Sequence, residues 1–89
     1  MFFVYSIYNK EKDKIYTGCT AELEKRIKRH NHLLPNKKTS YTSKNSGFWE
    51  LVYKEEFETR KQAMKREKEL KSSRGRDFIR TIIKNSIRL

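Results

Sequence analysis

This sequence is poor in cysteine and in long apolar runs, and each shortage excludes a class of protein. Its 89 residues include one cysteine, Cys19, so neither an internal disulfide nor a cysteine-based zinc cluster is expected. No apolar run approaches the roughly 20 residues of a membrane-spanning helix. The opening MFFVYSIY lacks a basic leader and a small-residue cleavage site, which argues against a signal peptide. We therefore expect a protein of the reducing cytoplasm with no membrane partner.

Acidic residues are also scarce, since 11 of them face 22 basic residues and leave a net charge of +11. A small domain with this surplus attracts polyanions, of which nucleic acid is the commonest. Charge alone does not separate a nuclease from a ribosomal protein or a membrane-surface binder. Charged residues make up 37% of the chain, but an aromatic content of 12% is enough for a compact core. We expect one domain over residues 1–89.

Side-chain periodicity predicts three short strands and three helices. The strands are expected at 2–8, 14–19 and 48–57, and the helices at 20–31, 60–72 and 77–85. Thr20 and Thr59 are predicted to cap the first two helices, and Gly75 to interrupt the pattern before the third. A polar loop is expected at 33–47. The order β-β-α-β-α-α predicts an α+β fold, a small three-stranded antiparallel sheet flanked by helices.

A carboxylate falls on the apolar face of the second predicted helix. Ala63, Met64 and Leu70 are expected on one face, and Glu67 lies within their arc, about 40° from Ala63. One alternative is that Glu67 sits at the rim and pairs with an arginine. An unpaired carboxylate in an apolar interior costs several kcal/mol. We therefore expect Glu67 to face a small polar pocket, with a metal ion or Arg26 nearby.

The first predicted helix carries two more polar groups on its inner side. His30 lies about 20° from Leu23 on the apolar arc that Ile27 also shares. Arg26 lies one turn before His30, at the edge of the same arc. The alternative for a histidine here is a satisfied core residue without chemistry.

Two tyrosines stand on the predicted strands. Tyr5 and Tyr16 lie side by side if the hairpin pairs them opposite each other. Gly18, at the end of the second strand, permits the close approach of backbone or ligand. Structural tyrosines are common in strands, so these phenols alone do not indicate a site.

These polar groups together suit phosphodiester hydrolysis if they meet around one phosphate-sized hollow. A carboxylate can hold one hard divalent cation, a guanidinium can neutralise phosphate, and a phenol or imidazole can relay the proton of attacking water. Because a single carboxylate cannot build a two-metal site, a single-metal mechanism is expected.

At these residues the sequence resembles the GIY-YIG endonuclease family in its compact, single-domain form. The resemblance rests on FVY (3–5), YTG (16–18), the positions of Arg26 and His30, and REKELK (66–71). The aromatic strand FWELVYKEEF matches as well, and the resemblance covers roughly residues 2 to 83. Phe3, Val4 and Thr17 depart from the motifs that give the family its name, at packing positions.

The resemblance implies a divalent-metal-dependent endonuclease that uses Mg²⁺ or Mn²⁺ and leaves 5′-phosphate and 3′-hydroxyl ends, as in DNA repair or recombination. Tyr5 would be the general base or position the water, and Tyr16 would bind phosphate or water. Arg26 would bind the scissile phosphate, His30 would assist proton transfer, and Glu67 would hold the metal. Some members also place an asparagine near the site, and the sequence does not decide between Asn31 and Asn85.

The remaining basic residues predict contacts to nucleic acid, with DNA expected over RNA and a monomer as the expected state. The candidates are Lys25, Arg29, Lys37, Lys38, Lys44, Lys71 and Arg74. The rival reading is a non-catalytic basic nucleic-acid-binding domain, either a degenerate nuclease or a ribosome-associated protein. A third reading, a module that binds acidic proteins, rests on charge alone. Cys19 is a weak candidate nucleophile, because no base adjoins it in the sequence.

Overall fold

The computed structural model describes residues 1–31 and 48–87. Three antiparallel strands form one sheet in the order β2-β1-β3. The strands are β1 (Phe2–Asn9), β2 (Lys14–Thr20) and β3 (Trp49–Phe57), and the helices are α1 (Leu23–His30), α3 (Arg60–Leu70) and α4 (Ser73–Ile87). This α+β architecture confirms the predicted fold class and element order. The predicted loop 33–47 lies wholly outside the described residues.

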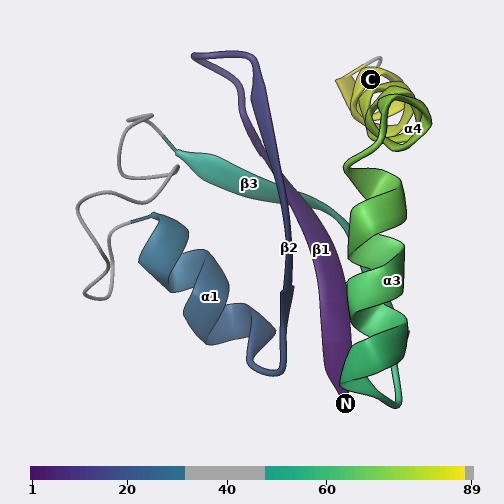
Figure 1. Ribbon diagram of the computed structural model, residues 1–89. Coiled ribbons are helices and arrows are strands. Elements are labelled where there is room, and N and C mark those ends of the chain that lie inside the picture. Colours follow the sequence, from purple (N-terminus) through teal and green to yellow (C-terminus); the bar gives the residue numbers. More distant parts are fainter. Residues whose placement is uncertain (32–47, 88–89) are drawn as a thin grey trace.

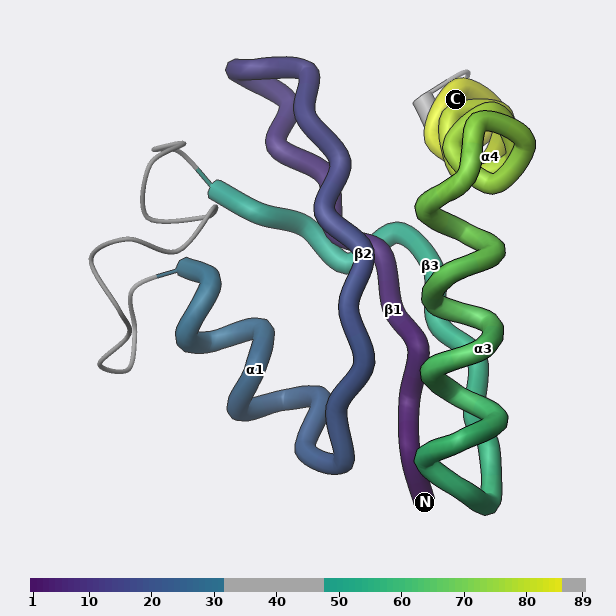
Figure 2. Tube along the Cα trace, in the orientation of Figure 1, coloured from purple at the N-terminus to yellow at the C-terminus, as the bar shows by residue number. Residues whose placement is uncertain are grey.

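Helices cover both faces of the sheet. The strands form the middle layer, with α1 on one side and α3 and α4 on the other (Figure 1). The chain turns sharply after α3, so that α4 runs across the end of α3 (Figure 2). Because β1 lies between the other two strands, its alternating side chains enter both layers.

One apolar core lies between the sheet and the pair α3 and α4. Val4 of β1 packs there with Ala63, Leu70, Ile79 and Ile83, all of them buried. Burying a side chain of the size of Leu or Ile contributes roughly 1.5–3 kcal/mol. These contacts fix α3 against the sheet and therefore decide where the polar residues of α3 lie.

Two large apolar residues of these helices are exposed. Met64 is 53% exposed because it lies about 100° around α3 from Ala63, beyond the arc that meets the sheet. Phe78 is 42% exposed, and its ring meets the ring of Tyr53 edge-on, with centroids 5.3 Å apart. The prediction that Met64 faces the core is therefore wrong.

The second core lies under α1. Tyr5, Ile7 and Trp49 are fully buried there, and Leu23 and Ile27 of α1 pack against them. This arrangement confirms that Leu23 and Ile27 form the inner face of the helix. It also means that the residues of α1 that share this face, Arg26 and His30, lie against the sheet.

Asn31 ties the end of α1 to the start of β3. Its side-chain amide donates to the carbonyl oxygen of Trp49 at 2.8 Å, and its Oδ1 accepts from the Trp49 N–H at 2.6 Å. One side chain thus pairs both backbone groups of a buried residue, groups that are costly to leave without partners. Asn31 holds α1 in place.

The helix starts agree with the sequence at one cap and differ at two others. Thr59 caps α3 in a capping box with Gln62, as predicted. Thr20 does not cap α1, because it still belongs to β2, and the helix begins at Leu23 behind Glu22. Gly75 does not interrupt a helix, since α4 begins at Ser73 and continues through it.

The hairpin does not pair Tyr5 opposite Tyr16, the condition under which the two phenols would lie directly side by side. The register sets Tyr5 opposite Gly18 and Tyr16 opposite Ile7, two residues further along β1. Because paired positions share a face, Tyr5 and Tyr16 still lie on the same face, as diagonal neighbours.

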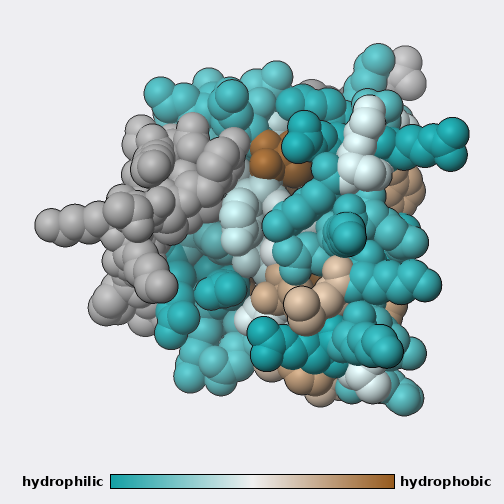
Figure 3. Space-filling view, viewed as in Figure 1, coloured by the Kyte–Doolittle hydropathy of each residue, from teal (hydrophilic) through white to brown (hydrophobic). Residues whose placement is uncertain are grey.

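The molecular surface is mainly hydrophilic on the face where β2 lies in front (Figure 3). Apolar atoms show there only as small patches between polar side chains. Within residues 1–31 and 48–87, no helix has the length and apolar character of a membrane-spanning segment.

We expect Gly75→Ala to lower the free energy of unfolding by about 1–3 kcal/mol, the usual cost of overpacking. A Cβ at this position would clash with the backbone of Glu69 and Leu70, where α4 meets the end of α3. Urea denaturation measures the change, and Arg74→Ala, at an exposed position of the same helix, is the control. Equal stability of the two variants would contradict this packing.

A candidate active site at the edge of the sheet

The candidate site begins with Tyr5, whose side chain is fully buried on the central strand. Its hydroxyl oxygen lies 2.8 Å from Nε2 of His30 on α1. The histidine is 7% exposed, and its ring centroid is 5.8 Å from that of Tyr5. This hydrogen bond joins the two elements that were predicted to carry the proton-transfer groups.

Tyr16 completes an aromatic cluster with Tyr5 and His30. Its ring centroid lies 6.3 Å from that of Tyr5 and 4.9 Å from that of His30, with tilted planes in both cases. Tyr16 is half-buried on β2, an outer strand of the sheet. The cluster therefore reaches from the central strand to the edge of the sheet.

Gly18 makes room for this cluster. A Cβ at this position would lie 2.8 Å from the Tyr5 hydroxyl and 3.0 Å from the Tyr16 ring. Real Cβ atoms essentially never approach this closely to the buried oxygen, so any other residue would push the phenols aside. The absence of a side chain lets Tyr5 lie across β2 toward its outer edge.

Arg26 joins the cluster from the same helix face as His30. Its Nε is buried and has no hydrogen-bond partner among the described residues. Its guanidinium acts on both Tyr5 and His30. Since buried polar atoms are almost always paired, this donor is a candidate to bind an acceptor from outside the described residues.

The environment of the cluster keeps both proton-transfer groups neutral. Burial raises the pKa of Tyr5, and Tyr16 adds to the rise, whereas the charge and hydrogen bonding of Arg26 oppose it. Burial, reinforced by the charge of Arg26, lowers the pKa of His30 to about 4. At neutral pH a phenol therefore faces an imidazole, and His30 can accept the phenolic proton if its Nε2 is unprotonated.

Glu67 lies on the other side of the sheet from this cluster. It belongs to α3, and Ala63 and Leu70 anchor that helix on the opposite face of the sheet. Its side chain is 24% exposed, and its carboxylate lies 2.8 Å from Nζ of Lys71, one turn later. Among the described residues its ion-pair partner is Lys71, so the expectation that Arg26 is the partner of Glu67 is not met.

The charge of Glu67 nevertheless reaches both faces of the sheet. Burial raises the pKa of the Cys19 thiol, and the charge of Glu67 adds to that rise. The same charge also raises the pKa of the Tyr5 phenol. Cys19 and Gly18 are consecutive on β2, and Tyr5 lies across Gly18. The carboxylate is thus near enough to act on the cluster although α3 lies on the other face of the sheet.

Glu67 is the carboxylate that acts on Tyr5, and it could hold a divalent cation near the cluster. The described residues contain no group of three or more His, Cys, Asp and Glu side chains that could enclose a metal. Glu67 suits a hard cation that keeps most of its ligands as water or phosphate. Its present partner is the ammonium of Lys71, which is 52% exposed and can turn into solvent. The donor chemistry fits a single, weakly enclosed metal ion.

The predicted nucleic-acid contacts are distributed over several elements. Lys25 and Arg29 are exposed on α1, with Lys25 3.5 Å from Glu22, and Arg74 is exposed in the first turn of α4. Lys71 is the partner of Glu67. Three further candidates, Lys37, Lys38 and Lys44, lie outside the described residues.

Three features of the site were missed by the sequence analysis. The spacing of Glu67 and Lys71 indicates an ion pair at i,i+4 and could have predicted their contact. Asn31, left open as an active-site residue, bonds the backbone of Trp49 instead. Ser6 and Thr17 share a buried hydroxyl–hydroxyl bond of 2.8 Å, for which a single sequence gives no signal.

Comparison with known proteins tests the resemblance to the GIY-YIG family independently of the geometry of the site. Residues 1–80 match the family described as the GIY-YIG catalytic domain. A UPF0213 protein of Clostridium perfringens is 36% identical over 88 residues, which cover 99% of this chain and 89% of the relative. A UPF0213 protein of Staphylococcus saprophyticus is 36% identical over 70 residues, or 79% of each chain. No solved structure shows significant similarity.

We expect Gly18→Ala to destabilise the protein by about 1–3 kcal/mol, because its Cβ would displace the Tyr5 hydroxyl from His30. Removal of that hydroxyl in Tyr5→Phe relieves the shortest contact. The double variant should therefore lose less than the sum of the two single losses. Urea denaturation of the four proteins measures the coupling, and strict additivity would show that the contact is absent.

His30 should make stability depend on pH. Its pKa in the folded protein is about 4, below the value of about 6.5 in an unfolded chain, so the unfolded state binds the proton first. The free energy of unfolding should fall as the pH drops from about 6.5 to about 4 and level off below that.

Urea denaturation of the parent and of His30→Gln at several pH values isolates this effect. Glutamine retains a polar partner for Tyr5 but does not titrate in this range. The parent should lose stability relative to the variant by an amount on the order of 1–3 kcal/mol. Parallel pH profiles would contradict a depressed pKa for His30.

Proposed function

Because this chain belongs to the GIY-YIG family, we propose that it is an endonuclease that hydrolyses phosphodiester bonds. DNA is the proposed polymer, Mg²⁺ or Mn²⁺ the proposed cofactor, and a monomer the proposed working state. A chain with a single cysteine has no internal disulfide to maintain, which agrees with the cytoplasm as the proposed compartment.

The orphaned donor of Arg26 is the observation that carries this proposal. Its Nε is buried beside Tyr5 and His30 without a hydrogen-bond partner among the described residues. A phosphate oxygen would satisfy it and would be held by a guanidinium, the group best suited to planar, bidentate contact with phosphate. As negative charge increases on the phosphate oxygens, the same cation stabilises the transition state.

Tyr5 and His30 supply a path for the proton of the attacking water. The phenol accepts a proton from water while its own proton passes along the 2.8 Å hydrogen bond to Nε2 of His30. The water oxygen then bonds to phosphorus as the bond to the leaving oxygen breaks, and the leaving oxygen takes up a proton from solvent water to become a hydroxyl. The relay needs no ionised phenol beforehand, which agrees with the raised pKa of Tyr5.

Tyr16 and Glu67 take the remaining roles. Tyr16 stands at the outer strand, where its hydroxyl can hydrogen-bond the phosphate or the water. Glu67 would hold the divalent cation, which when bound supplies positive charge for the phosphate and the leaving oxygen. Since Glu67 comes from the other face of the sheet, the substrate phosphate has to lie at the edge of β2.

We expect Tyr5→Phe and Arg26→Lys each to reduce the rate of metal-dependent DNA cleavage by about 10²–10³-fold. Glu67→Gln should reduce it at least as much, and a chelator should abolish it. Cleavage of labelled branched, single-stranded and duplex DNA in Mg²⁺ or Mn²⁺ measures the rates.

Two controls match the chemistry of these substitutions away from the cluster. Tyr53→Phe removes a phenol that bonds Glu55 on β3, and Glu69→Gln removes an exposed carboxylate of α3. Both should cleave at close to the parent rate. If the parent binds DNA but cleaves none of these substrates with either metal, the chain is a non-catalytic binding domain and the proposal fails.

A further inference from the structure

A basic groove runs along the outer edge of β2, beside the cluster. Its volume is about 470 Å³, and it lies between β2 and the junction of α3 with α4. The charged and aromatic residues that line it are Asp13, Lys14, Tyr16, Lys71, Arg76 and Arg80. Four cations thus face one carboxylate, and Tyr16 belongs both to this groove and to the aromatic cluster.

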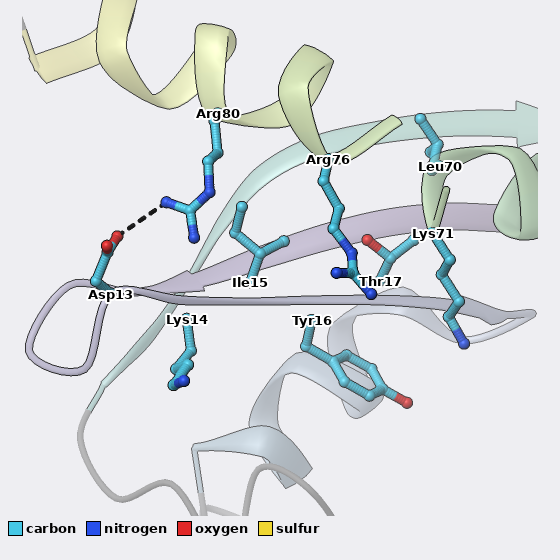
Figure 4. A pocket seen from close by; sticks show the side chains of 9 residues that line it. All are labelled: Asp13, Lys14, Ile15, Tyr16, Thr17, Leu70, Lys71, Arg76 and Arg80. Atoms are coloured by element: carbon cyan, nitrogen blue, oxygen red, sulfur yellow. Dashed lines mark hydrogen bonds and ion pairs between the residues drawn. The ribbon is translucent and has the colours of Figure 1, made fainter. Parts of the chain in front are cut away.

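Lys71, Arg76 and Arg80 lie along β2 on the side of α3 and α4, whereas Lys14 projects from the other side of the strand with Tyr16 (Figure 4). Arg76 and Arg80 reach from α4 toward β2, and Lys71 extends from the end of α3 toward the side on which Tyr16 projects (Figure 4). Arg76 and Arg80 are one helical turn apart, a rise of about 6 Å. That separation is comparable with the distance between neighbouring phosphates of a nucleic-acid strand. Arg76 has no ion-pair partner among the described residues.

The opposite edge of the sheet has the opposite charge. β3 carries Glu50, Glu55 and Glu56 against the single Lys54. Because β2 and β3 are the two outer strands, a polyanion is attracted to one edge and repelled from the other. The charge distribution therefore favours the β2 edge as the docking side.

We propose that this groove binds the sugar-phosphate backbone of the substrate strand and leads it to Tyr16. Lys71 and Arg76 hold the phosphates next to the cluster, and Lys14 holds those further along β2. The part of this inference that leads the strand to Tyr16 rests on the proposed endonuclease function, but binding in the groove requires no cleavage. None of these contacts reads a base, so the groove gives affinity without sequence preference.

Asp13 lies at the end of the groove next to Arg80 (Figure 4). Its carboxylate accepts hydrogen bonds from the Tyr8 hydroxyl at 2.9 Å and from Arg80 at 3.1 Å. Arg80 is thereby held away from phosphate, and the negative charge repels the next phosphate along the strand. Both members of the ion pair are at least half exposed, so the fold depends little on it.

The test measures DNA binding in EDTA, where no metal-dependent cleavage occurs. Fluorescence anisotropy follows the affinity for a labelled single strand and a labelled duplex from about 50 to about 200 mM salt. Arg76→Ala should weaken binding several-fold and make the slope of log K against log salt shallower by about 0.7–0.9. Arg76→Lys should restore most of the slope, because it restores the charge.

Two further variants sharpen the test. Lys61→Ala removes the same charge from the exposed first turn of α3, at the opposite end from Lys71, and should bind as the parent does. Asp13→Asn should bind several-fold more tightly with a steeper slope, because it releases Arg80. Asparagine tolerates the positive φ of 52° at this turn. Circular dichroism checks that every variant is folded.

The outcomes separate this inference from the proposed function. Equal losses in Arg76→Ala and Lys61→Ala, or no gain in Asp13→Asn, would overturn the groove even if the parent cleaves DNA. Weaker binding in Arg76→Ala and tighter binding in Asp13→Asn support the groove even if the parent never cleaves. If polyglutamate binds through Arg76 and DNA does not, the groove binds an acidic protein and the proposal that it binds a sugar-phosphate backbone is wrong.

Discussion

The hydrogen bond between Tyr5 and His30 is the contact on which the rest of the site depends. It joins the central strand to α1 through two side chains that are almost without solvent exposure. Losing either partner would leave a buried polar group unsatisfied, which costs about 1–3 kcal/mol. The bond can form because Gly18 leaves space above the neighbouring strand. One glycine thus allows a buried pair that can also exchange a proton.

The two layers of the molecule serve different ends. The layer beneath α3 and α4 is an ordinary apolar core, built on Val4, Leu70 and Ile79. The layer beneath α1 replaces part of its apolar contact with phenols, an imidazole and a partly buried guanidinium. Burying such groups is costly, and a core elsewhere in the same small chain offsets that cost. Chemistry is therefore confined to one layer and to the strand edge next to it.

The edge of β2 is reached by side chains from both layers. Tyr16 projects from this strand on the side of α1, whereas Glu67 and Lys71 approach it from the side of α3. Side chains from both faces of the sheet can reach past an outer strand, because no further strand is bonded to its free edge. A phosphate at this edge meets groups from both layers, and the basic groove beside it extends the same edge along the strand.

The sequence alone determined the elements, their order and the inner face of α1, because side-chain periodicity is a local property. It placed Arg26 and His30 against the sheet with Leu23 and Ile27, as the structure confirms. Tertiary packing decided the rest. The register set Tyr5 opposite Gly18, and the docking of Ala63 and Leu70 placed Glu67 on the far face. The groove joins Lys14 to Arg76 and Arg80, residues far apart in the chain, so only the folded protein could show it.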